Sequence, residues 1–132
     1  MSIYTKCIFK KSEAIDGERI SVMSRHTLEE EVTKDGRITK KSYDVWLGVL
    51  SPPNEFTLAY FEGHITWKEY EILYISFLNK KDISEEVKSL AKKGLERDIT
   101  LLCSEENADR CHRRLLAKEC KKYEPKLKVE HR

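Results

Sequence analysis

The chain has 132 residues, 39% hydrophobic and 36% charged, so its length fits one small domain with a modest core and leaves little room for a second. Its 25 Lys and Arg residues nearly balance its 23 Asp and Glu residues, and the formal net charge of +2 argues against a general polyanion-binding protein. The balance hides an asymmetry, because residues 107–132 carry nine basic and four acidic residues, a net charge of +5.

The first two predicted strands flank a turn. Residues 3–9 alternate in a β-favouring stretch, and Glu18 to Ser24 is a second candidate strand after the turn signal Asp16-Gly17. We expect these two strands to be neighbours in a sheet. Residues 25–41 are polar, carry another turn signal at Asp35-Gly36, and are expected to form a long connection with room for a small hairpin.

Two helices are predicted in the middle of the chain. An apolar stretch from Tyr43 to Leu50 is of uncertain type, and after it Ser51-Pro52-Pro53 opens a helix that Gly63 closes. The buried face of this helix is expected to carry Phe56, Ala59 and Tyr60. A capping box over Thr66 to Glu69 then starts a second helix. Its apolar stripe, which is typical of core packing, comprises Trp67, Tyr70, Leu73, Tyr74 and Phe77.

The last third of the chain alternates helices and strands. A third helix begins at Asp82 and ends at Gly94 as its C-terminal cap, with a core face made of Ile83, Val87, Leu90, Ala91 and Gly94. The apolar run Ile99 to Cys103 predicts a strand covered on both faces in a parallel sheet. A helix over Ala108 to Lys122, with Asn107 as its N-cap, precedes an edge strand over Leu127 to His131.

This order of elements predicts the fold class α/β. We expect a single compact three-layer Rossmann-like domain over residues 1–132, with a mostly parallel central sheet of about four to five strands.

Membrane and disulfide classes are not supported by the sequence. No apolar run approaches the roughly 18 residues that cross a bilayer, and residues 1–11 do not form a signal peptide, so we expect a cytoplasmic protein without a membrane partner. The four cysteines are irregularly spaced and lack a C-x-x-C pair, so they are expected to be reduced thiols: Cys7, Cys103, Cys111 and Cys120.

Candidate functional residues gather where strands end and helices begin, the edge at which open parallel sheets bind ligands. Two segments are expected there: Met23 to Thr27, and Cys103 to Asn107 with Cys111 to Arg114 in the first turns of the last helix. On a helical wheel, Cys111 and His112 lie on or beside the apolar arc. A separate basic face carries Arg110, Arg113, Arg114, Lys118 and Lys121.

Cys111 has two interpretations. It is either a thiolate of lowered pKa near a helix start or a small buried hydrophobic residue. Cys103 is either core or the floor of a site. A metal site would combine Cys103, Cys111 and His112 with His26 or Glu105, but the spacing C-x7-C-H matches no zinc pattern and neighbouring helical residues diverge by about 100°. No metal or other cofactor is predicted.

A family resemblance rests on two segments. The first runs from Asp16-Gly17 through Arg19 to Leu28, and the second comprises Thr100 to Cys103, Glu105 and Cys111 to Ala117, with the helix start Trp67 to Glu71 between them. On these residues the chain resembles the small archaeal and bacterial members of the DUF488 family over nearly its whole length. The resemblance implies a compact α/β fold with a Rossmann-like sheet and no established reaction.

The same resemblance implies a set of recurring positions in one branch of the family, at Arg25, Cys103, Glu105, Cys111, His112 and Arg113. A second branch has Asn-His where this chain has Cys111-His112. The resemblance therefore favours His112 and Arg25 over Cys111 as functional residues.

The first functional hypothesis is an enzyme with an anion-binding pocket at the strand ends. Its substrate would be a phosphorylated metabolite, a nucleotide or a nucleic acid, and its anionic group would be held by Arg25, Arg113, Ser24 and Thr27. His112 or His26 is the candidate general acid or base. Glu105 would orient it or accept a proton, and Cys111 would be the nucleophile or a neighbour that tunes it.

Two alternatives stay open. The basic face of the last helix, with Arg110, Arg114, Lys118 and Lys121, would serve a binding module for nucleic acid or an acidic protein. Cys103 and Cys111 would instead serve a thiol redox sensor. In each case we expect a monomer or a small homo-oligomer.

Overall fold

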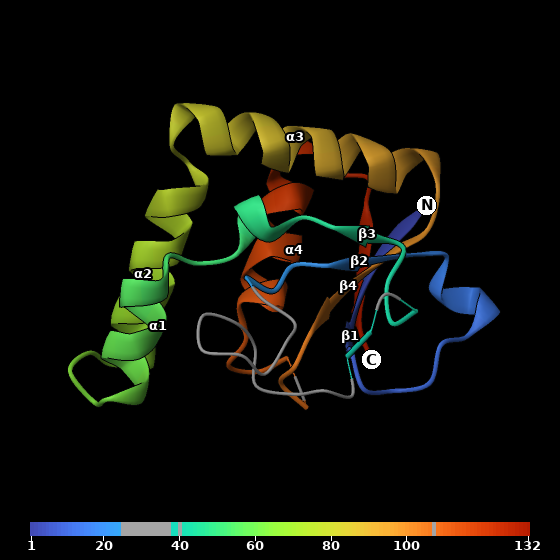
Figure 1. Cartoon of the computed structure of the whole chain (residues 1–132). Coiled ribbons are helices and arrows are strands. Elements are labelled where there is room, and N and C mark those ends of the chain that lie inside the picture. Colours follow the sequence, from blue (N-terminus) through green and yellow to red (C-terminus); the bar gives the residue numbers. More distant parts are fainter. Residues whose placement is uncertain (25–37, 40, 107) are drawn as a thin grey trace.

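Parallel strands form the central sheet of the computed structural model, which describes residues 1–24, 38–39, 41–106 and 108–132. Within these residues the sheet has five strands in the order β3-β2-β4-β1-β5 (Figure 1). All neighbouring pairs are parallel, which confirms the predicted Rossmann-like α/β class. The strands are β1 (Ser2–Cys7), β2 (Glu18–Ser21), β3 (Val45–Trp46), β4 (Ile99–Cys103) and β5 (Lys128–His131).

The expected pairing of the first two strands is wrong, because β4 lies between β1 and β2. Ile99 is in register with Ile3 on one side and with Glu18 on the other. All five residues of β4 are buried, as the apolar run Ile99 to Cys103 predicts. A strand that is buried on both faces gains most from the centre of the sheet, and this gain outweighs the proximity of β1 and β2 along the chain.

Four helices and two short 3-10 turns complete the described part of the chain. They are η1 (Ala14–Asp16), η2 (Gly48–Leu50), α1 (Asn54–Phe61), α2 (Trp67–Leu78), α3 (Lys81–Glu96) and α4 (His112–Tyr123). Side chains of α2, α3 and α4 share one hydrophobic core with the face of the sheet that carries Ile3, Ile20 and Leu101. No helix within the described ranges is long and apolar enough to cross a membrane.

The helix α2 begins with the predicted capping box. The Glu69 amide donates to Thr66 Oγ1 at 3.1 Å, and the Thr66 amide donates to Glu69 Oε1 at 2.9 Å. Tyr70 and Tyr74 are buried as expected, but Leu73 is 37% exposed and Leu78 takes its place in the core.

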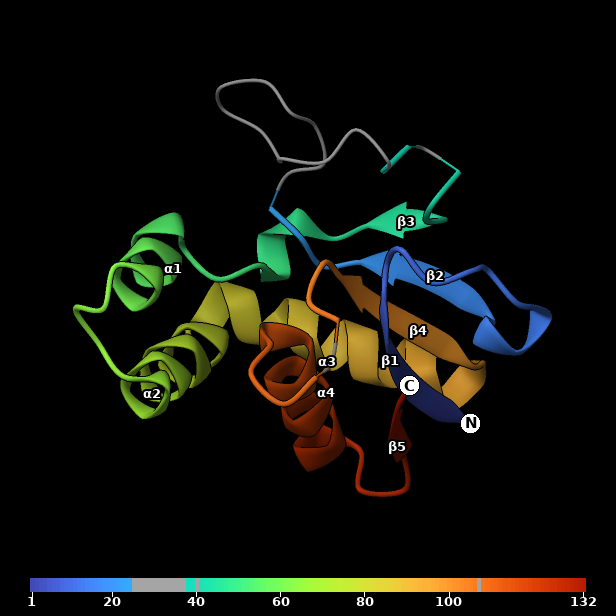
Figure 2. The ribbon, with the colours of Figure 1, turned by 90° about the horizontal axis from the view of Figure 1, so that it is seen from below.

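The helix α1 lies with α2 at one side of the molecule, away from the sheet (Figure 2). None of its residues is buried, so the predicted buried face is only half-buried: Phe56, Ala59 and Tyr60. Gly63 closes the turn after it with a φ of 79°, a conformation that favours glycine.

Gly94 does not cap α3, which continues to Glu96. It lies in the buried face of the helix, and a Cβ atom there would lie 2.9 Å from Ile3 Cγ1 and 3.1 Å from Leu127 Cδ2. Glycine is therefore required here by close packing of α3 on the sheet, and the predicted core face of α3 is otherwise confirmed.

Replacing Gly94 with Ala should lower the free energy of unfolding by up to about 2 kcal/mol. Overpacking costs about 1–3 kcal/mol, and the roughly 1 kcal/mol that Ala adds in helix propensity offsets part of this cost. Urea denaturation measures the change, and Ser89→Ala on the exposed face of the same helix is the matched control. A Gly94→Ala variant as stable as Ser89→Ala would contradict the packing role.

The opposite face of the sheet carries a buried ionic cluster. Asp16 accepts hydrogen bonds from Lys6 Nζ at 3.0 Å and from Arg19 NH1 at 2.5 Å, and its carboxylate is fully buried. Thr100 Oγ1 donates to the Asp16 carbonyl at 2.6 Å. Because Lys6, Arg19 and Thr100 alternate along their strands with core residues, this polar cluster and the hydrophobic core occupy opposite faces.

Candidate functional site

A pocket of about 390 Å³ lies at the edge of the sheet where β4 ends, the edge at which the sequence predicts a site. Its polar and sulfur-bearing lining includes Ser24, Cys103, Glu105, Arg110, Cys111 and His112. Tyr60, Trp67 and Tyr70 line it from α1 and α2. The ring of Trp67 lies 5.5 Å from that of Tyr60 and 5.0 Å from that of Tyr70, so these three residues form an aromatic wall.

The start of α4 positions two of these residues. The helix begins at His112 with Cys111 as its N-cap, not at Ala108 after Asn107 as predicted. Cys111 has extended backbone angles, φ −138° and ψ 143°, so it is not yet part of the helix. The helical wheel that separates Cys111 from His112 by 100° therefore does not apply to Cys111, and both side chains can face the end of β4.

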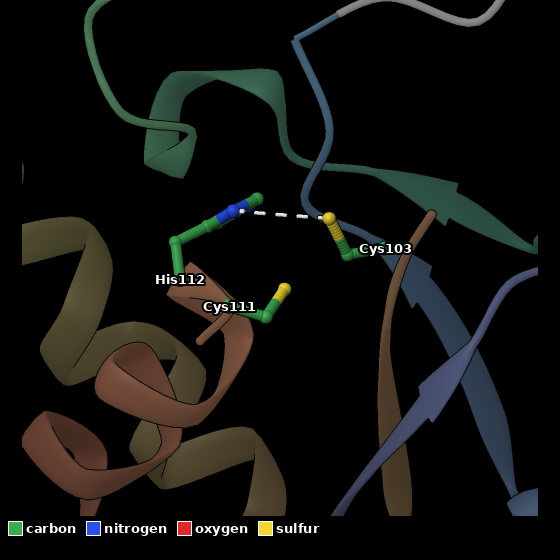
Figure 3. Close-up of side chains that lie close together, drawn as sticks. All are labelled: Cys103, Cys111 and His112. Carbon is green, nitrogen blue, oxygen red and sulfur yellow. Dashed lines mark hydrogen bonds between the residues drawn. The ribbon is translucent and has the colours of Figure 1, made fainter. Parts of the chain in front are cut away.

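Cys103 and His112 both line the pocket, and Figure 3 shows their side chains facing each other. Cys103 Sγ lies 3.8 Å from His112 Nδ1, and both side chains are buried. On the other side of the ring, His112 Nε2 lies 2.8 Å from the Val22 carbonyl oxygen. Because a carbonyl only accepts, Nε2 carries a proton, and Nδ1 is the atom that exchanges a proton with the Cys103 sulfur.

Cys111 completes a three-residue cluster with this pair. The ligating atoms of Cys103, Cys111 and His112 all lie within 4.8 Å of one another, and Figure 3 shows the Cys111 side chain between the other two. The Cys111 thiol is therefore close enough to the Cys103 sulfur to influence its ionisation.

The electrostatics of the cluster favour a thiolate at Cys103. The hydrogen bond from Cys111 holds the pKa of the Cys103 thiol well below its ordinary value against the effect of burial, and the His112 ring and the Glu105 amide lower it further. Burial works against a charged His112, but the charge on Cys103 and its hydrogen bond raise the pKa of the imidazole. The two groups therefore favour a thiolate and an imidazolium.

Cys111 differs from Cys103 in its protonation. Burial raises the pKa of the Cys111 thiol well above its ordinary value, and the neighbouring Cys103 raises it further. Cys111 is therefore the protonated donor of the pair, and the two sulfurs have different chemical roles.

Arg113 is buried, whereas the sequence places it on a solvated basic face. Its side chain is 0% exposed, and its NH1 donates to the Glu105 carbonyl at 2.8 Å and to Cys111 Sγ at 3.4 Å. Its Nε and NH2 atoms have no hydrogen-bond partner within the described structure. Arg113 lies at i, i+3, i+4 and i+7 with the buried Leu116, Ala117 and Cys120, so it belongs to the buried face of α4 and not to its solvated basic face. The charge of Arg113 lies next to the thiol cluster and does not line the pocket.

Of the remaining predicted anion-binding and catalytic residues, some line the pocket and the others lie outside the described part of the chain. Ser24 and Glu105 line the pocket. Arg25, His26 and Thr27 lie outside the described residues, so their predicted roles are not placed.

The basic face of α4 is exposed where it was expected, apart from Arg113. Arg110 lines the pocket, whereas Arg114, Lys118 and Lys121 line a second hollow of about 420 Å³. Lys121 Nζ donates to the carbonyls of Pro125 and Leu127. A nucleic-acid role for this face stays a prediction.

The residue that sequence reasoning undervalued is Cys103. Cys111 was the candidate nucleophile, but the structure gives the lowered thiol pKa to Cys103. The available signal was its position as the last residue of a largely apolar strand, at the edge where parallel sheets place their sites.

Three ligand atoms at this spacing can also hold a metal ion. Two cysteine sulfurs and one histidine nitrogen, with a fourth position open to the pocket, would suit a thiophilic divalent ion such as zinc. The sequence argued against a metal because adjacent helical side chains point about 100° apart. Cys111 has an extended backbone, so this angle does not separate it from His112. Two other features oppose a cation: Cys111 favours its protonated form, and the Arg113 guanidinium touches its sulfur.

Comparison with protein-family models gives one match. A model described as the active DUF488-N3 subclade matches residues 3–124. Searches of the curated proteins and of the solved structures found no match to the chain.

Proposed function

Because the chain belongs to the DUF488 family, within the subclade described as active, we propose that it is an enzyme whose nucleophile is the Cys103 thiolate. The observation that carries this proposal is the pairing of Cys103 Sγ with His112 Nδ1 while His112 Nε2 is held by the Val22 carbonyl. A nucleophile, a base beside it and a third group that orients the base are the parts that covalent catalysis requires.

The proposed reaction is hydrolytic group transfer in two steps. The Cys103 thiolate attacks an electrophilic atom of the substrate, a bond forms to Sγ, and the bond to the leaving group breaks while His112 Nδ1 gives its proton to that group. Neutral His112 then takes a proton from water, the water oxygen attacks the same electrophilic atom, and the Cys103 thiolate leaves. The Cys111 thiol donates to the sulfur before attack and after release.

The pocket supports a small anionic substrate with a planar part, such as a nucleotide. Arg110 at the pocket supplies a cation for the anionic group. The aromatic wall of Tyr60, Trp67 and Tyr70 offers an apolar surface for a ring. Arg25 was the predicted anion-binding residue, and its contribution remains part of this proposal.

We expect iodoacetamide to alkylate Cys103 selectively at pH 6, with a rate that stays high well below the pH at which an ordinary thiol, of pKa about 8.5, ionises. The native protein is labelled across pH 5–9 and the modified peptides are quantified by mass spectrometry. Cys103→Ser should abolish the low-pH labelling.

Cys120→Ala is the matched control for this labelling, because Cys120 packs in the core and burial raises its pKa to about 12. It should leave the pH profile unchanged. The same variants are then tested with p-nitrophenyl acetate, whose turnover should require Cys103. Two results would overturn the proposal. One is a labelling rate of Cys103 whose pH midpoint is that of an ordinary thiol. The other is equal p-nitrophenyl acetate turnover by Cys103→Ser and the native protein.

A further inference from the structure

Cys111 is a second thiol at the site to which the reaction above gives no covalent role. Its side chain is 2% exposed and that of Cys103 is 5% exposed, yet both line the pocket. A molecule as small as hydrogen peroxide can reach both sulfurs through the pocket.

We propose that Cys103 is a site of reversible oxidation by hydroperoxides and that Cys111 resolves the oxidised sulfur into a Cys103–Cys111 disulfide. This proposal rests on the thiolate assigned to Cys103 in the proposed function. It adds a regulation of that site, because a sulfur held in a disulfide cannot attack a substrate.

The chemistry needs two steps and one equivalent of peroxide. The Cys103 thiolate attacks one peroxide oxygen, the O–O bond breaks, and the products are Cys103 sulfenic acid and hydroxide. The Cys111 sulfur then attacks the Cys103 sulfur, its proton leaves with the hydroxyl group as water, and the disulfide forms. Peroxide is reduced by two electrons, which the two sulfurs supply.

The position of Cys111 suits the second step. Its sulfur lies within 4.8 Å of the Cys103 sulfur, and both residues line the same pocket. Cys111 precedes the first helical residue, so its side chain can approach Cys103 without breaking a hydrogen bond inside α4.

Arg113 explains why Cys111 becomes a nucleophile only after Cys103 has been oxidised. The nearby Cys103 helps to raise the pKa of the Cys111 thiol, whereas the Arg113 charge lowers it. Once Cys103 is a neutral sulfenic acid, its opposing charge is gone while Arg113 NH1 remains 3.4 Å from Cys111 Sγ. Cys111 then ionises more readily, and only at this stage does it become a nucleophile.

Cys7 is the competing partner, because it is in register with Cys103 on the adjacent strand β1. Its thiol instead donates to the Ser104 carbonyl at 3.7 Å, and Cys7 is not among the described residues that line the pocket. We therefore assign the resolving role to Cys111 and use Cys7→Ser as the matched control.

The test treats the reduced full-length protein with one equivalent of hydrogen peroxide, blocks free thiols with N-ethylmaleimide and maps the peptides. We expect one intramolecular Cys103–Cys111 disulfide that dithiothreitol reverses completely. Cys111→Ser should instead accumulate Cys103 sulfenic acid, which dimedone captures, and should progress to sulfinic acid in excess peroxide. Cys7→Ser should behave as the native protein does.

Several results would overturn the inference. A disulfide to Cys7, a link between two chains, or equal oxidation of native protein and Cys111→Ser would each remove the role of Cys111. If the thiols are oxidised only after a chelator has been added, Cys103, Cys111 and His112 hold a metal ion instead. If peroxide leaves Cys103 untouched while iodoacetamide still labels it at pH 6, this inference fails and the proposed function stands; an ordinary Cys103 pH profile rejects both.

Discussion

Replacing His112 with Gln should slow the alkylation of Cys103 at pH 6 by about 100-fold. An opposite charge within hydrogen-bonding range lowers a thiol pKa by roughly 1–3 units, and once the pKa of Cys103 rises above the assay pH each further unit lowers the thiolate fraction about tenfold. Gln keeps an N–H donor for the Val22 carbonyl, so the variant removes the charge and the proton acceptor while preserving an anchor at this position. Rates are measured with iodoacetamide at pH 6 and at pH 9.

The pH dependence separates an electrostatic role of His112 from a structural one. At pH 9 the thiol ionises without help, so His112→Gln should react there within a few-fold of the native protein. Trp46→Phe is the matched control, because Trp46 Nε1 donates to the Met23 carbonyl at 2.6 Å and supports the same exit from β2. Slow labelling at both pH values, or a Trp46→Phe variant as slow as His112→Gln at pH 6, would show that the histidine only holds the backbone.

Replacing Asp16 with Asn should lower the free energy of unfolding at pH 7 by about 3–5 kcal/mol. Removing one partner of a buried ion pair is strongly destabilising, and here the nearly fully buried Arg19 loses its ion pair with Asp16, while the equally buried Lys6 keeps a carboxylate partner in the exposed Glu13. Urea denaturation of native protein and variant measures the loss. Glu13→Gln is the control: Glu13 also pairs with Lys6 but is 58% exposed, so its removal should matter much less.

The same carboxylate gives the stability a defined pH dependence. Burial opposes the charge of Asp16, but hydrogen bonds from the Glu13 amide, Lys6 and Arg19 hold its pKa below the ordinary value. A lowered pKa in the folded state means that the unfolded state binds the proton more tightly, so this stabilisation is present above about pH 4 and is lost as the pH falls further. The stability difference between native protein and Asp16→Asn should therefore shrink in acid, and a constant difference down to pH 2 would contradict this account.

Local patterns in the sequence predicted the elements well. The core face of α3 and the buried strand β4 follow from the spacing of apolar residues, and the capping box of α2 follows from four adjacent residues. These features are decided by interactions within one element, which a single sequence contains.

Errors arose where a position depends on distant residues. The pairing of β1 with β4 depends on which strand gains most from the centre of the sheet, and no local pattern reports that comparison. Likewise, the Arg113 side chain donates to the carbonyl of Glu105, eight residues away, and the lowered thiol pKa of Cys103 depends on Cys111 and His112 at the start of α4. The edge of the sheet that carries the site was predictable, but the choice of the reactive cysteine required the geometry.

The central place of β4 also constrains how the chain folds during synthesis. The first two strands leave the ribosome early, but neither pairs with the other, and both need residues 99–103 as their common partner. The strand β2 can pair early only with the two-residue strand β3, and β1 has no partner until most of the chain has been made, which predicts slow, late formation of the native topology. A nascent chain stalled before Ile99 is therefore expected to expose β1 to proteases and chaperones, whereas release of the chain through β5 supplies β4, Cys111, His112 and the last strand, so that the full sheet and the thiol site can form.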